Sequence, residues 1–183
     1  MVKKELRAKY KLLRKELSAD QLAELSTAIF KLTIQTFELE GKKISAFLPI
    51  ERFLEINTWP FLEQIKAEFY LPVIMGENEL KHIKYEEHSQ IKETEWGIPE
   101  PTVGESIHPS KLDFVLVPLL AIDKNGYRVG YGKGFYDQFL TSCASNCKFI
   151  GLSYFDPIDK IDNLHEADIP LHYCVTPTKL IQF

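Results

Sequence analysis

The stretch that decides the fold is residues 112–137, which reads LDFVLVPLLAIDKNGYRVGYGKGFYD. Residues 112–118 are apolar nearly throughout, as expected of a strand buried on both faces of a parallel sheet. A turn-rich segment over residues 123–134 follows, and a helix is predicted over 135–142. Parallel sheets bind ligands at the C-terminal ends of their strands. The loop after this strand is therefore where we expect a ligand.

Two helices are predicted at the start of the chain. Leu6, Tyr10, Leu13 and Leu17 recur at spacings of four, three and four, which is typical of one face of an amphipathic helix over residues 2–17. The other faces are basic, with Lys3, Lys4, Arg7, Lys9, Lys11, Arg14 and Lys15. The Ser-Ala-Asp-Gln sequence from Ser18 is a capping box, which predicts a second helix through about residue 37.

The remaining elements alternate between strand and helix. Strands are predicted at residues 43–48, 68–73, 80–85, 148–154 and 173–176, a helix at 58–67, and a polar surface loop at 86–110. This alternation favours an α/β fold of Rossmann-like type, with three layers and a mostly parallel central sheet flanked by helices. The length of 183 residues suits a single domain over residues 1–183.

Composition excludes several classes of protein. Hydrophobic residues make up 45% and charged residues 26%, as in ordinary globular proteins. The net charge of −4 argues against nucleic acid and against an anionic membrane as partners. Three cysteines form no disulfide framework, and neither a signal peptide nor a membrane-spanning run is evident. We expect a cytoplasmic protein that is a monomer or a weak homo-oligomer.

The glycine-rich loop carries the chemistry. Gly130, Gly132 and Gly134 alternate, so backbone N–H groups can approach a phosphate without obstruction. Arg128 and Lys133 supply positive charge, and Asp137 suits the Mg²⁺ that accompanies nucleotides. The spacing matches neither common nucleotide-binding fingerprint. A flexible surface turn, with Asp137 stabilising a helix start, is the alternative interpretation.

Residues 117–137 resemble the signature of the 5-formyltetrahydrofolate cyclo-ligase family, from Val-Pro through Arg-Val-Gly-Tyr-Gly-Lys-Gly-Phe-Tyr-Asp. Further segments agree with the family in the same order: KKELR at 3–7, EINT at 55–58, GIPEP at 97–101, and DIP at 168–170 before Thr176-Pro177. Residues 50–54 differ from the usual loop, and Leu171-His172 replaces a common apolar-Asp pair. The resemblance runs over nearly the whole chain.

The resemblance implies an enzyme that uses MgATP to convert 5-formyltetrahydrofolate, a reduced folate, to 5,10-methenyltetrahydrofolate, ADP and phosphate. It implies catalytic roles for Arg128 and Lys133 and Mg²⁺ binding by Asp137 and Asp168. Folate binding is expected at Ile50, Glu55, Tyr131 and Phe135. ATP binding is expected at Lys3, Lys4, Arg7, Arg128, Val129, Gly130, Tyr131, Gly132, Lys133, Gly134, Phe135 and Tyr136.

Simpler interpretations compete for several of these residues. The basic face of the first helix can be a solvated surface, and Glu55 a carboxylate favoured at a helix start. Asp168 fits a turn. The five histidines show no metal-ligand spacing, and the two tryptophans suit packing. At the level of function, the alternatives are a relative that binds folate or nucleotide without turnover, and an ATP-dependent enzyme for another formamide or carboxylate.

Overall fold

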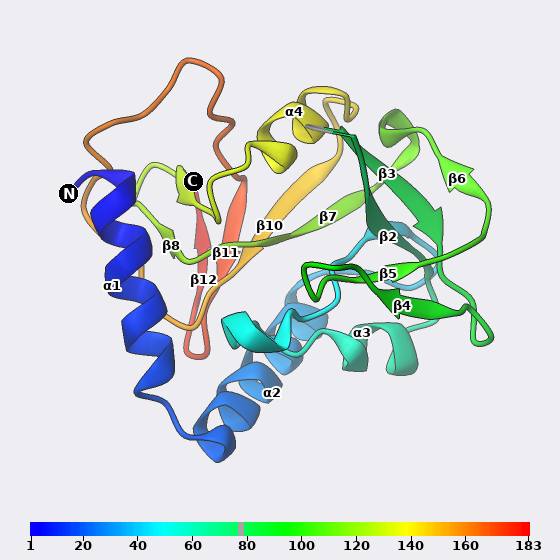
Figure 1. Ribbon diagram of the computed structural model, residues 1–183, viewed down its shortest axis with the longest axis horizontal. Helices are drawn as coiled ribbons and strands as arrows, with labels where there is room; N and C mark the ends of the chain where they lie inside the picture. The colour runs from blue at the N-terminus through cyan, green and yellow to red at the C-terminus, as the bar shows by residue number, and fades with distance from the viewer. Residues whose placement is uncertain (77–78) are drawn as a thin grey trace.

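A central sheet organises the molecule, whose computed structural model describes residues 1–76 and 79–183. Its strands are β1 Lys43–Ser45, β2 Glu68–Met75, β3 Glu79–Lys84, β6 Ser106–Ile107, β7 Phe114–Pro118, β10 Lys148–Leu152, β11 Tyr173–Val175 and β12 Leu180–Gln182. The strand order is β12-β11-β10-β7-β1-β2-β3-β6 (Figure 1). The inner strands from β11 to β2 pair in parallel, whereas β12, β3 and β6 add antiparallel edges.

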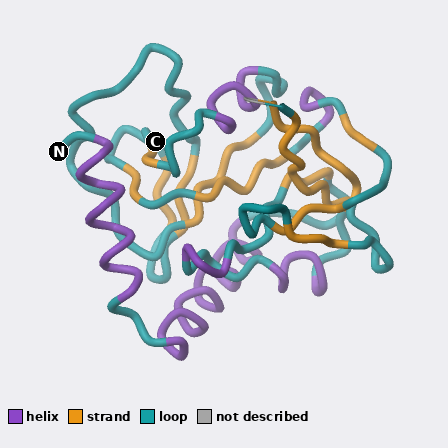
Figure 2. Tube along the Cα trace, viewed as in Figure 1, coloured by secondary structure: helices purple, strands orange, loops and turns teal. Residues whose placement is uncertain are grey.

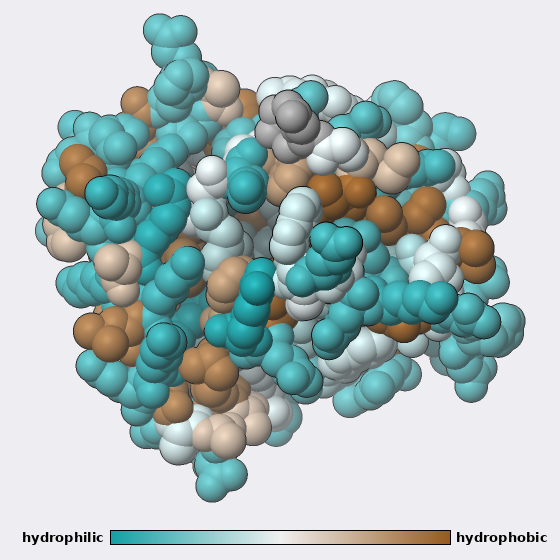
Figure 3. Space-filling view, viewed as in Figure 1, coloured by the Kyte–Doolittle hydropathy of each residue, from teal (hydrophilic) through white to brown (hydrophobic). Residues whose placement is uncertain are grey.

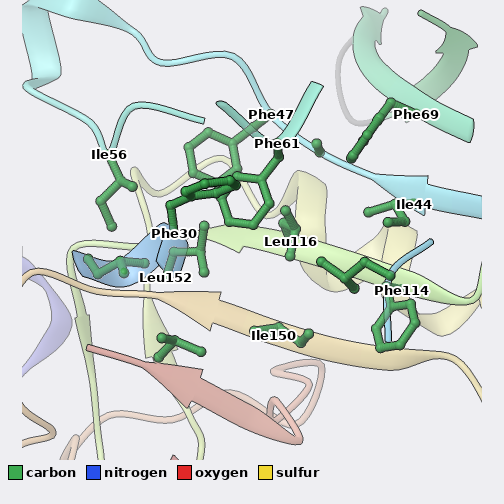
Figure 4. Close-up of a cluster of buried hydrophobic side chains, with 14 of the residues drawn as sticks. Phe30, Ile44, Phe47, Ile56, Phe61, Phe69, Phe114, Leu116, Ile150 and Leu152 are labelled. Carbon is green, nitrogen blue, oxygen red and sulfur yellow. The ribbon is translucent and has the colours of Figure 1, made fainter. Parts of the chain in front are cut away.

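Helices cover both faces of this sheet (Figure 2). Side chains alternate along β7, so that Phe114 and Leu116 face one side and Val115 and Val117 the other. The helices α2 (Ala19–Thr36) and α3 (Trp59–Gln64) pack on the first side, where Figure 4 shows the cluster around Leu116. On the second side lies α4 (Phe135–Thr141). The predicted three-layer α/β fold with a mostly parallel sheet is confirmed.

The first helix, α1 (Lys3–Lys15), packs outside these layers against a small hairpin. The hairpin pairs β8 (Ala121–Ile122) with β9 (Arg128–Val129), and Leu6 and Tyr10 are buried against it. The third buried residue of α1, Arg14, departs from the sequence prediction. This residue was assigned to the charged outer surface but is only 2% exposed, and backbone carbonyls and a tyrosine hydroxyl accept hydrogen bonds from its Nη1 and Nη2 groups.

The prediction of a continuous loop at 86–110 is wrong. This segment forms β4 (Ile91–Glu93), β5 (Pro99–Pro101), β6 and the short 3₁₀ helix η2 (Pro109–Lys111). Both β4 and β5 are short and polar or proline-rich, so pairing with each other rather than local propensity creates them. The edge strand β12 was likewise not predicted. No helix in the described part of the chain is long and apolar enough to cross a membrane.

A buried histidine makes the stability of this fold depend on pH. His82 on β3 is 1% exposed and stacks on Phe139 of α4, with ring centroids 4.1 Å apart. Neither ring nitrogen has a hydrogen-bond partner among the described residues. Burial lowers the pKa of His82 to about 3, so the native state resists protonation. The contribution of neutral His82 to the stability of the native state is fully present above the unfolded-state pKa of about 6.5. It is lost progressively as the pH falls from there toward 3.

We therefore expect the His82→Leu variant to lose part of the acid sensitivity of the wild type. Between pH 7 and pH 5, proton uptake by the unfolded state should cost the wild type about 2 kcal/mol that the variant does not lose. Urea unfolding at both pH values measures the difference. The exposed His88→Gln variant is the control. Equal losses in His82→Leu and wild type would show that another group governs the acid response.

Candidate functional site

A cavity of about 960 Å³ opens where β1 and β7 end. Because these two strands are parallel neighbours, the segments that follow both of them leave the same edge of the sheet. Figure 3 shows this face of the molecule, with mainly hydrophilic side chains over α1 and apolar patches over β2 and β3. The cavity thus lies between a basic helix and an apolar wall.

The glycine-rich loop forms one side of the cavity. Gly132 and Gly134 have positive φ angles of 96° and 74°, a conformation that glycine adopts without strain. Lys133 between them is exposed and lines the cavity, as do Tyr131 and Phe135. The loop is therefore open to a ligand through both its backbone and a cationic side chain.

One face of α1 supplies further cations. Lys3, Arg7 and Lys11, each four residues apart, line the cavity, because positions i and i+4 share a helix face. The Arg7 Nε donates a hydrogen bond of 2.9 Å to the Gly130 carbonyl, which ties the helix to the loop. Lys4 is exposed and lies outside the cavity lining, so the structure does not bring this predicted residue to the site.

Arg128 anchors the glycine-rich loop from within. Its Nη2 lies 2.8 Å from Asp137 Oδ1, and its Nη1 donates to the Ile169 carbonyl at 2.6 Å. The Ile169 N–H in turn donates to Asp137 Oδ1 at 3.1 Å. Burial lowers the pKa of Arg128, and the neighbouring Asp137 opposes that effect. This closed set of contacts fixes the loop against the 168–170 segment.

The second predicted metal ligand, Asp168, pairs with Lys3. The Lys3 ammonium lies 2.5 Å from both carboxylate oxygens, and the two side chains are only 15% and 13% exposed. Burial acts to raise the pKa of Asp168, but Lys3 and the His165 N–H outweigh it, so the pKa is lowered. Its carboxylate is therefore held in the charged form.

The other side of the cavity is formed around Glu55. Its carboxylate is buried and accepts a 2.8 Å hydrogen bond from the Ile50 N–H. Burial raises the pKa of Glu55, although the Tyr131 hydroxyl, the Ile50 N–H and the charge of Arg14 each favour the ionised form. A carboxylate enclosed in this way prefers a ligand that donates hydrogen bonds.

The remaining predicted residues divide between the cavity and the core. Ile50 and Tyr136 line the cavity, and the Tyr136 hydroxyl is buried without a hydrogen-bond partner among residues 1–76 and 79–183. Val129 is fully buried against α1 and does not reach the cavity with its side chain. A contact between Val129 and ATP would therefore come from the Val129 backbone.

Several lining residues were missed from the sequence. Lys11 had a usable signal, because it continues the spacing of Lys3 and Arg7. Most of the others are apolar or aromatic and come from segments that no local pattern brings together: Phe47, Leu48, Phe53, Pro72, Ile74, Leu80, Trp96 and Ile98. Two further missed lining residues, Arg52 and Glu100, are charged. Phe53 stacks on Tyr131 with ring centroids 4.5 Å apart.

The donor set suits a metal ion that arrives with a nucleotide. Within the described ranges, no three His, Cys, Asp or Glu side chains are grouped to hold a metal on their own. Asp137 and Asp168 line the same cavity, and each already pairs with a cation. Nucleotide-bound Mg²⁺ commonly takes only one or two protein carboxylates, its other ligands being phosphate and water. These two residues fit that pattern.

Known proteins resemble the chain over nearly its full length. The model of the 5-formyltetrahydrofolate cyclo-ligase family matches residues 1–177. The 5-formyltetrahydrofolate cyclo-ligase of Escherichia coli K12 is 33% identical over 135 residues, covering 69% of this chain and 74% of that protein. The mouse protein of the same name is 29% identical over 156 residues, covering 79% and 76%.

A solved structure agrees with these sequence matches. The NMR structure of Aquifex aeolicus 5,10-methenyltetrahydrofolate synthetase superposes with a TM-score of 0.85 at 28% identity, covering 100% of this chain and 93% of that one. The match includes the helix, the glycine-rich loop and the segment around Glu55 that together enclose the cavity. The chain therefore belongs to the 5-formyltetrahydrofolate cyclo-ligase family.

Proposed function

We propose that the cavity binds ATP and 5-formyltetrahydrofolate side by side and transfers the γ-phosphoryl group of ATP to the formyl oxygen. The family reaction converts 5-formyltetrahydrofolate to 5,10-methenyltetrahydrofolate at the expense of ATP. The observation that carries the proposal is the division of one cavity into two unlike halves. Lys3, Arg7 and Lys133 surround one half, and Glu55 lies with an apolar wall in the other.

The cationic half suits the triphosphate. Lys133 and the amides from Gly130 to Gly134 would contact the phosphate oxygens, with Lys3 and Arg7 closing from α1. Arg128, held by Asp137, would add its positive charge at the base of the loop. Asp137 and Asp168 would hold Mg²⁺, which neutralises phosphate charge when it is bound. Catalysis in this half is positioning and charge neutralisation.

The other half suits the folate. Glu55 would accept hydrogen bonds from donor groups of the pterin, and Ile50, Tyr131 and Phe135 would pack on its rings. Ile74, Leu80 and Ile98 add further apolar lining to the same cavity, which would suit the less polar part of the substrate.

The chemistry needs no nucleophilic side chain. The formyl oxygen attacks the γ-phosphorus, and the bond from that phosphorus to the β-phosphate oxygen breaks, giving ADP and an N5-iminium phosphate. N10 then adds to the former formyl carbon and loses its proton. The carbon–oxygen bond breaks, and inorganic phosphate leaves with the formyl oxygen. Phosphorylation is required because the unmodified formamide oxygen is a poor leaving group.

The direct test follows the methenyl product by its absorbance. We expect product to form from 5-formyltetrahydrofolate only when Mg²⁺ and ATP are both present, with one ADP released for each product molecule. Folded protein that forms no product would overturn the proposal. Folate binding without ADP release would instead indicate a binding protein, and turnover of another formamide or carboxylate alone would indicate a different substrate.

The glycine-rich loop allows a matched comparison between two alanine variants. In Gly132→Ala, the alanine would have to adopt a φ of 96°, and its Cβ would lie 3.2 Å from the Arg7 guanidinium carbon. A Cβ at Gly130 meets nothing within 4 Å and needs no positive φ. We expect Gly132→Ala to raise the KM for ATP about 10-fold, because strain of roughly 1–2 kcal/mol disturbs the loop. Gly130→Ala should have a smaller effect. Equal effects in steady-state kinetics would contradict this account of the loop.

A further inference from the structure

Arg14, at the end of α1, lies behind the cavity and does not line it. Its guanidinium is buried, which is costly for a charge unless its N–H groups are paired. Nη1 donates to the Phe53 carbonyl at 3.1 Å and to the Tyr131 hydroxyl at 3.0 Å, and Nη2 donates to the Leu119 carbonyl at 2.5 Å, whereas Nε is buried without a partner among the described residues. The planar guanidinium fork allows one side chain to reach all three.

These three acceptors belong to segments far apart in the chain. Phe53 lies in the short 3₁₀ helix η1 (Glu51–Phe53), which precedes Glu55. Tyr131 lies in the glycine-rich loop, and Leu119 directly follows β7. Phe53 and Tyr131 also stack on each other, with their planes 17° apart. Arg14 therefore connects both halves of the cavity to the sheet from which they extend.

Tyr131 passes this connection on to Glu55. Arg14 donates to the phenol oxygen of Tyr131, so the phenol O–H remains available as a donor. The Tyr131 hydroxyl favours the ionised form of Glu55 and so partly offsets the rise in the pKa of Glu55 that burial causes. The guanidinium also stacks over the Tyr154 ring at 5.5 Å, and the Tyr154 hydroxyl donates to the Glu55 carbonyl at 3.0 Å. Both routes lead to the same residue.

We propose that Arg14 is a positioning residue of the reaction: it holds Glu55 and the glycine-rich loop at a fixed separation, so that the formyl oxygen meets the γ-phosphate. This inference rests on the proposed function. Errors of about 1 Å in such an arrangement can cost about 100-fold in rate. Arg14 should therefore matter more for the reaction than for ATP binding.

The principal variant is Arg14→Met, which keeps an apolar stem and removes every donor. We expect the KM for 5-formyltetrahydrofolate to rise about 10-fold and kcat to fall about 10-fold at saturating ATP. The Kd for ATP, measured by calorimetry, should change less than about 3-fold. Arg14→Lys, which keeps the charge but not the fork, should rescue little of the loss. Lys15→Met, an exposed neighbour on the same turn, should match the wild type.

The pH profile separates positioning from a merely structural role. Glu55 is faced by Arg14, Tyr131, Tyr136 and Tyr154, and of these Arg14 carries the positive charge. Removing it should raise the pKa of Glu55 further and move the acidic limb of the kcat/KM profile to higher pH. Loss of folded protein alone would lower activity equally at every pH.

The outcomes are distinguishable. Folded Arg14→Met with both kinetic constants within twofold of wild type overturns the inference, and so does full rescue by Arg14→Lys. If Arg14→Met does not fold, Arg14→Lys decides: a KM for folate raised at least about 5-fold supports positioning, and wild-type constants overturn it. Wild-type protein without methenyl product would instead overturn the proposed function itself.

Discussion

Replacing Lys133 by alanine is expected to lower kcat at least 100-fold, which corresponds to about 3 kcal/mol of lost transition-state stabilisation. The side chain lies between Gly132 and Gly134, is exposed to the cavity, and makes no ion pair with the residues that the structure describes. Its charge is therefore available to the transferred phosphoryl group. Because it supports nothing in the fold, the thermal midpoint should stay within a few degrees of wild type.

Lys124→Ala is the matched control for this variant. Lys124 is also exposed and lies in the same stretch of sequence, but it pairs with Asp159 at 2.5 Å away from the cavity. Its loss should change kcat less than twofold, since exposed ion pairs contribute little. Undiminished activity of Lys133→Ala would contradict the proposed role of the glycine-rich loop in catalysis.

The Glu55→Gln variant is expected to lose folate turnover while gaining stability. Removing the carboxylate should lower kcat/KM for 5-formyltetrahydrofolate about 100-fold, because the buried acceptor for pterin donors becomes a neutral amide. Since burial raises the pKa of Glu55, ionisation of this carboxyl lowers the stability of the native state relative to the unfolded state. Thermal unfolding of Glu55→Gln should therefore occur at or above the wild-type temperature.

This opposite movement of activity and stability identifies a functional carboxylate. Glu51→Gln, an exposed change in the same loop, should alter neither quantity appreciably. The Kd for ATP should also be unchanged in Glu55→Gln, because the residue lies in the other half of the cavity. Loss of stability together with activity would contradict our assignment and make Glu55 a structural residue.

The parts of the site carried by local chemistry were predictable from the sequence. Residues 112–137 combine an apolar strand, alternating glycines and two cations, and each feature acts over a few residues. The strand β7 and the open loop after it appear where they were expected. The spacing of apolar residues similarly predicted α1, and the capping box at Ser18 predicted α2.

The meeting of Glu55 with this loop follows from topology instead. The two lie more than 70 residues apart and come together because β1 and β7 are adjacent and parallel, a pairing that no local pattern specifies. The family resemblance supplied that link. Arg14 was assigned to the wrong surface for the same reason, since its acceptors are backbone carbonyls and a hydroxyl of distant segments.

The edges of the sheet were the least predictable part of the fold. The edge strands β6 and β12 were not predicted, although β11, which pairs with β12, was. The separate pair β4–β5 forms from short segments whose composition does not favour strands, so pairing decides their conformation. Lys4 shows a similar limit on what the sequence of a helix predicts, because it was expected at the site but does not line the cavity. A basic helix in sequence does not indicate which of its cations faces a ligand until the packing of its apolar face is known.

The central claim is that ATP phosphorylates the formyl oxygen in this cavity. It is tested most directly with 5-formyltetrahydrofolate that carries ¹⁸O in the formyl group. During turnover with MgATP, the account predicts that each inorganic phosphate released contains the labelled oxygen, detected by mass spectrometry or by the isotope shift in ³¹P NMR. Phosphate without the label, formed at the same rate as methenyl product, would contradict it.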